Sequence, residues 1–107
     1  MKERATFAAI RENQGFSIEQ VAEFLCLPKE KINAWETGEG TIGIASIEMA
    51  CELFGCTLSM IQGKEKLNLL PKIQNAHLMT REEMEVIRAA NKIALNLRYM
   101  KRLEGEE

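Results

Sequence analysis

The 107-residue sequence contains no aspartate, two prolines, one tryptophan, one tyrosine and a single histidine, His77. No apolar run approaches the roughly 20 residues that a membrane-spanning helix requires, and there is no glycine-rich phosphate loop. We expect no secretory signal either, because the charged start Met1–Arg4 leads into an amphipathic segment. The sequence therefore argues against a membrane protein and predicts a location in the cytoplasm.

Groups that carry catalysis or bind metals are also scarce. The three cysteines, Cys26, Cys51 and Cys56, cannot all pair within one molecule, and we interpret them as reduced thiols. His77 has no cysteine or serine near it in a recognisable motif, and every carboxylate side chain is a glutamate. We expect no enzymatic activity, no metal and no cofactor.

What the sequence does contain is helical periodicity. Apolar residues recur at spacings of three and four, and no run alternates as a half-buried strand would. With 46% hydrophobic and 28% charged residues, the chain can build one modest core. The pattern predicts an all-α protein: a five-helix bundle in residues 1–63, a linker over 64–79 that packs on the bundle, and a long C-terminal helix within 80–107.

Start and stop signals place the first two helices. The first is predicted from about residue 3 to Gln14, with Gly15 placed to end it in the left-handed conformation. Ser17 can cap the next helix while Gln20, three residues on, returns the hydrogen bond as a capping box. This second helix continues to about residue 25.

Pro28 separates the second helix from the third, which we expect to run to about Thr37. Ile32 and Trp35 fall on one side of this third helix and anchor it. Its opposite side is free and carries Lys29, Glu30, Asn33, Ala34 and Thr37.

A turn-rich loop precedes the fourth helix, which Gly55 ends, and Thr57 can cap a short fifth helix that stops near Gly63. The residues of the fourth helix that are spaced to pack inward are Ile44, Ile47, Ala50, Leu53 and Phe54.

Two short helices split by three or four residues, the second with a polar outer face, are typical of a helix-turn-helix. Over residues 4–63 the chain resembles the phage-repressor-type helix-turn-helix family, also called the xenobiotic-response-element family. The positions that carry the resemblance are Ile10-Arg11, Phe16-Ser17, Val21-Ala22, Leu25, Ile32, Trp35-Glu36, Gly38, Ala50, Leu53-Phe54-Gly55, Leu58 and Ile61.

The resemblance implies a dimeric transcription factor, a repressor, that binds two half-sites of double-stranded DNA with its third helix in the major groove. In such a groove Lys29 can donate to guanine, Glu30 can accept from cytosine, and Ala34 can touch a thymine methyl. The amino end of the second helix would lie near a phosphate. The candidate DNA-binding residues are Ser17, Lys29, Glu30, Lys31, Asn33, Ala34 and Thr37.

Several positions depart from the family pattern. Ile18 stands where a DNA-contacting glutamine is common, Cys26 where the turn usually has glycine, and Pro28 where a capping serine is usual. The loop after the third helix carries Glu39 in place of basic residues. Residues 1–63 hold five basic and nine acidic side chains, a net charge of −4. Because phosphate neutralisation supplies most non-specific affinity, each subunit should bind DNA weakly.

The C-terminal helix opens with a second capping box, Thr80 and Glu83, and is expected to reach about Leu103. Apolar residues recur along it at alternating steps of four and three, far beyond what the bundle needs for cover. We call these residues, Val86, Ala90, Ile93, Leu97 and Met100, the apolar stripe. Three roles remain open for it: self-association into a homodimer, packing back on the bundle, or docking to another protein.

A second function also remains open. A repressor-like bundle that has weak or lost DNA binding could serve as a protein-interaction module. The resemblance implies, for such a module, the role of an antitoxin or of a partner for a toxin or protease.

Overall fold

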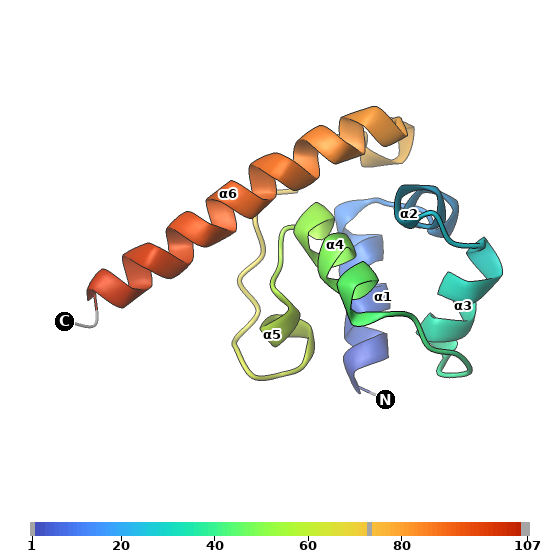
Figure 1. Ribbon diagram of the computed structural model, residues 1–107, viewed down its shortest axis with the longest axis horizontal. Helices are drawn as coiled ribbons and strands as arrows, with labels where there is room; N and C mark the ends of the chain where they lie inside the picture. The colour runs from blue at the N-terminus through green and yellow to red at the C-terminus, as the bar shows by residue number, and fades with distance from the viewer. Residues whose placement is uncertain (1, 73, 106–107) are drawn as a thin grey trace.

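The protein is all-helical across the described part of the chain, as the sequence predicts. The computed structural model describes the backbone of residues 2–72 and 74–105 and the side chains of residues 4–72 and 74–98. Helices α1 to α5 form a bundle, and α6 lies across one side of it and runs past it (Figure 1). In chain order the elements are α1 Lys2–Gln14, α2 Ile18–Leu25, α3 Lys29–Thr37, α4 Ile44–Phe54, α5 Leu58–Ile61, the 3₁₀ turn η1 Ala76–Leu78 and α6 Arg81–Gly105.

Local capping sets the starts of α2 and α6. Ser17 Oγ accepts from the Gln20 N–H at 3.1 Å, and Gln20 Oε1 accepts from the Ser17 N–H at 2.9 Å. Thr80 and Glu83 repeat this arrangement at the start of α6. Both predicted capping boxes are confirmed, and each satisfies two backbone N–H groups that a helix start leaves unpaired.

The end of α2 is unusual because a cysteine takes the left-handed conformation. Cys26 has φ 58° and ψ 41°, its N–H donates to the Glu23 oxygen, and the Leu27 N–H donates to the Ala22 oxygen at 2.9 Å. Non-glycine residues adopt this conformation infrequently. The Cys26 side chain is exposed, so the turn has room for a side chain at the position where glycine is usual.

The core centres on an aromatic cluster. The ring of Phe7 contacts Trp35 at 6.2 Å and Phe54 at 5.4 Å between centroids, both edge-on. Ile32 and Trp35 are buried, which confirms that they anchor α3. The prediction that Ile44 packs inward is wrong, because it is 60% exposed. Ile44 is the first residue of α4, beside an exposed loop. It lies on the same side of the helix as the buried residues, but no other described element covers that end of α4.

Residues 64–79 include a segment that is bound to the bundle. The Leu70 N–H donates to the Gly55 oxygen at 2.9 Å. The Gln20 amide, which already serves the α2 capping box, donates through Nε2 to the Ala76 oxygen at 2.8 Å and the Met79 oxygen at 3.2 Å. One side chain therefore joins the start of α2 to the segment that leads into α6.

Helix α6 packs on α4 and α2 through one face, which we call the bundle face. Met84 and Leu95 are buried there. Arg88 Nε donates to Glu52 Oε1 at 2.9 Å, and the Asn91 amide donates to the Glu52 backbone oxygen at 2.9 Å. Contacts of one helical face thus fix α6 on the bundle.

The described part of the apolar stripe lies on a different side of α6. Val86, Ile93 and Leu97 are 67%, 63% and 61% exposed, and Ala90 is exposed as well. The Met100 side chain lies outside the described residues. At 3.6 residues per turn, the described part of the stripe is centred about 160° around the helix from the bundle face. Packing on the bundle, one of the three roles left open for the stripe, is therefore carried out by another face of α6, and the described part of the stripe stays exposed.

Candidate nucleic-acid interface

Helix α3 carries six of the seven predicted DNA-binding residues, and the seventh, Ser17, caps the start of α2. α3 packs on α1 and α2, with Ile32 and Trp35 directed into the core. Lys29, Glu30 and Asn33 are exposed on its other side. A helix held by apolar contacts on one face and open on a polar face suits insertion into a groove of DNA.

A groove of about 440 Å³ opens between the start of α2 and the outer face of α3. The structure brings four of the predicted residues to it, one from α2's cap and three from α3. The side chains that line it are Arg11, Ser17, Ile18, Glu19, Lys29, Glu30 and Asn33.

Three predicted residues lie outside this groove. Ala34 is half-buried, since the loop after α3 folds over it: the N–H groups of Glu39 and Gly40 donate to the Ala34 oxygen. The Thr37 hydroxyl donates within α3, to the Asn33 oxygen at 3.0 Å and the Ala34 oxygen at 3.2 Å. Lys31 is exposed, but not among the groove's lining residues.

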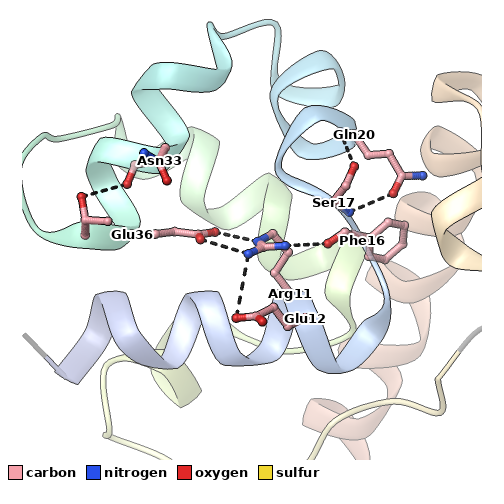
Figure 2. A network of polar contacts seen from close by, with 8 residues as sticks. Arg11, Glu12, Phe16, Ser17, Gln20, Asn33 and Glu36 are labelled. Carbon is pink, nitrogen blue, oxygen red and sulfur yellow. Dashed lines mark hydrogen bonds and ion pairs between the residues drawn. The ribbon is translucent and has the colours of Figure 1, made fainter.

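A buried ion pair holds α3 against α1 (Figure 2). Arg11 Nε donates to Glu36 Oε2 at 2.7 Å and Nη2 donates to Oε1 at 3.1 Å. Its Nη1 donates to the Phe16 backbone oxygen at 2.7 Å, in the turn before α2. The Arg11 and Glu36 side chains are only 10% and 7% exposed. A forked, satisfied contact of this kind fixes α1, the α1–α2 turn and α3 relative to one another.

This ion pair was not predicted from the sequence, although a signal for it exists. Arg11 and Gln14 fall four and seven residues after Phe7, on the buried side of α1. A charged residue in that register requires a partner. Periodicity does not identify the partner, because Glu36 is 25 residues away.

A second ion pair lies at the surface of the groove. Lys29 Nζ is 3.4 Å from Glu19 Oε2, and the two side chains are 58% and 66% exposed. Hydrogen bonding from its own backbone N–H, and then the contact with Lys29, hold the pKa of Glu19 below its usual value. Lys29, the predicted guanine donor, is therefore paired with a carboxylate in the structure without DNA.

The other reactive side chains lie away from this groove. Cys51 and Cys56 are buried, and a hydrogen bond between them together with burial raises the pKa of the Cys51 thiol. Among the residues that the structure describes, no cluster of three cysteine, histidine or acidic side chains is placed to hold a metal ion. No helix in that part of the chain is long and apolar enough to cross a membrane.

Comparison with protein families gives a match to the helix-turn-helix family model over residues 7–61, just over half of the chain. The search of curated proteins and that of solved structures give no significant match. The matched residues span the described helices from within α1 to the end of α5, including α2, the Cys26 turn and α3. The chain belongs to the phage-repressor and xenobiotic-response-element type of helix-turn-helix proteins, a DNA-binding and not an enzymatic family.

Proposed function

We propose that the protein is a cytoplasmic transcriptional repressor that binds a two-half-site operator as a homodimer, with α3 of each subunit in the major groove. The observation that carries this proposal is that α3 packs on the bundle through one face and leaves its polar face exposed. Ile32 and Trp35 fix the helix on the bundle, while Lys29, Glu30 and Asn33 remain exposed beside the amino end of α2.

The chemistry of this surface suits base edges and phosphates. Lys29 can donate to O6 or N7 of guanine, and Glu30 can accept from N4 of cytosine. Asn33, on the same face, lies close to bases or backbone, and the amino end of α2 around Ser17 can bind a phosphate through backbone N–H groups. Ala34 and Thr37 occupy the far part of α3, where Gly40 of the following loop lies against the Ala34 methyl, so we assign the main base contacts to Lys29, Glu30 and Asn33.

The net charge of −4 on residues 1–63 makes a second subunit important. One acidic module gains little from counterion release, so useful affinity requires two linked modules on one DNA. The apolar stripe of α6 is the surface we assign to the second copy. It faces away from the bundle, and α6 extends past the bundle, so two copies can pair along it without releasing the bundle face (Figure 1). A two-fold pairing also matches an inverted repeat of half-sites.

The test is selection of binding sites from random duplexes, followed by affinity measurements on the enriched sequence. We expect Lys29→Ala and Asn33→Ala each to weaken binding by about 1–3 kcal/mol, because each removes a donor from the base-facing side of α3. The melting temperature should stay unchanged, since both residues are exposed. Lys72→Ala, an exposed lysine in the linker, is the charge-matched control and should change affinity little.

Two results would contradict the proposal. If no sequence is enriched and the protein binds no duplex, it is not a DNA-binding regulator. If a sequence is enriched but both α3 variants bind it as the unmodified protein does, another surface contacts the DNA.

A further inference from the structure

We propose that Glu19 is an internal competitor for DNA phosphate, a positioning residue that holds Lys29 and the amino end of α2 until DNA displaces it. This inference rests on the proposed function, since it concerns the same surface. It predicts that the protein binds DNA more weakly than its helix-turn-helix geometry allows, and that the Glu19 side chain accounts for a measurable part of this weakness.

Glu19 lies in the first turn of α2. It is the second residue of the helix, where backbone N–H groups have no partner within the helix. Anions are favoured at this end, which is where a DNA phosphate is expected. The Glu19 carboxylate already lies at this end of α2, where backbone hydrogen bonding and its contact with Lys29 hold its pKa below the usual value. A negative charge of the protein thus stands where a phosphate would bind.

The cations that line the groove are both paired with carboxylates of the protein. Two basic side chains line it, Arg11 and Lys29. Arg11 is bound by Glu36 in a buried, forked contact with a 2.7 Å bond. Lys29 is held by Glu19 at 3.4 Å. Neither cation is therefore available to a phosphate unless a carboxylate moves.

The two carboxylates differ in how readily they can move. Glu36 is buried and doubly bonded, whereas Glu19 and Lys29 are both more than half exposed. Exposed ion pairs are weak and exchange their partners readily. DNA can therefore displace Glu19 and take Lys29, while the Arg11–Glu36 pair stays in place. Glu19 then remains as a negative charge beside the DNA backbone and lowers the affinity of the complex.

The test compares Glu19→Gln with the unmodified protein. Glutamine keeps the size of the side chain but removes its charge, so Lys29 becomes available and the repulsion is lost. We expect binding to tighten by about 5-fold or more at roughly 50 mM salt, with the slope of log K against log salt steeper by about 0.9 per subunit. Because Lys29 is also the proposed guanine donor, the gain should be at least as large on the selected operator as on an unrelated duplex.

Two further variants make the test specific. Glu48→Gln removes the same charge from an exposed residue of α4, outside the groove, and should change the affinity by less than about 2-fold. In a Lys29→Met background, the gain from Glu19→Gln should fall to less than half, since the cation that Glu19 holds is absent. The melting temperatures of all variants show whether the fold is retained.

An equal effect of Glu19→Gln and Glu48→Gln would overturn the inference, as would weaker binding by Glu19→Gln. A full gain in the Lys29→Met background would also overturn it, because Glu19 would then not act through Lys29. All of these outcomes presuppose that the unmodified protein binds the selected DNA. Failure of that binding would refute the proposed function itself.

Discussion

Helices α3 and α6 each pack on the molecule through one face, but their exposed faces differ in polarity. Each is fixed to the molecule by one face, through Ile32 and Trp35 in α3 and through Met84 and Leu95 in α6. The face that α3 leaves open is polar and charged, whereas α6 leaves open the apolar stripe. A polar open face suits hydrated base edges, and an apolar one suits a protein surface that excludes water. The difference supports our proposal that α3 binds DNA and that the apolar stripe of α6 binds a second subunit.

The largest expected effect concerns the apolar stripe. Ile93→Gln combined with Leu97→Gln removes four apolar side chains from a symmetric dimer. At about 1.5 kcal/mol per buried side chain, the dimer should weaken by roughly 6 kcal/mol, or about 10⁴-fold in its dissociation constant. Analytical ultracentrifugation over a concentration series measures the shift.

Lys92→Gln is the matched control for this experiment, because it places the same residue at a neighbouring exposed position of α6. It should leave the dimer intact. A monomeric unmodified protein at tens of micromolar would contradict the assignment of the stripe to a second copy.

The next largest effect concerns the ion pairs that hold α3 and α6 on the rest of the protein. Arg11→Met leaves the Glu36 carboxylate buried without its partner, and should lower the free energy of unfolding by about 3–5 kcal/mol. Arg88→Met removes the ion pair of α6 with Glu52, whose side chains are 28% and 23% exposed, and should cost about 1 kcal/mol or less. Urea denaturation measures both.

Replacing Glu36 as well, in the double variant Arg11→Met and Glu36→Gln, should recover part of the loss by removing the unpaired charge. Equal losses in Arg11→Met and Arg88→Met would show that burial does not distinguish the two ion pairs.

The smallest expected change in stability comes from substitutions in the two capping boxes. Gln20→Glu keeps the cap of α2, since glutamate serves equally well there. It replaces the amide that donates to the Ala76 and Met79 oxygens, so unfolding should become easier by about 1–2 kcal/mol. Glu83→Gln in the α6 box, an exposed position, should change stability by less than about 0.5 kcal/mol.

Thermal unfolding can measure this pair of variants. Unchanged stability in Gln20→Glu would mean that the link between α2 and the linker contributes nothing. In that case the start of α2 and the segment leading to α6 would be independent parts of the molecule.

Most of the helical pattern could be predicted because its signals are local. A capping box spans four residues, and a left-handed helix end is marked by glycine within a residue or two, as at Gly15 and Gly55. The anchoring of α3 by Ile32 and Trp35 likewise follows from a three-residue spacing. Ile44 shows the limit, since periodicity gives the side of a helix but not whether anything covers it.

The candidate site was predictable only in part. The exposed positions Lys29, Glu30 and Asn33 follow from the phase of α3, and their place beside Ser17 follows from the helix-turn-helix pattern. The pairing of Lys29 with Glu19 does not, because it joins side chains on two helices whose relative orientation depends on the whole core. For the same reason Ala34 could not be recognised as half-buried beneath the following loop.

By itself, the sequence determined the helices, their caps, the polar face of α3 and the apolar stripe of α6, all of which depend on residues within a few turns of one another. Tertiary structure decided which charges meet, Arg11 with Glu36 and Arg88 with Glu52. It also decided that α6 packs through a face other than its stripe. The physical reason is distance along the chain: these partners lie 25 and 36 residues apart, and only the folded core brings them together.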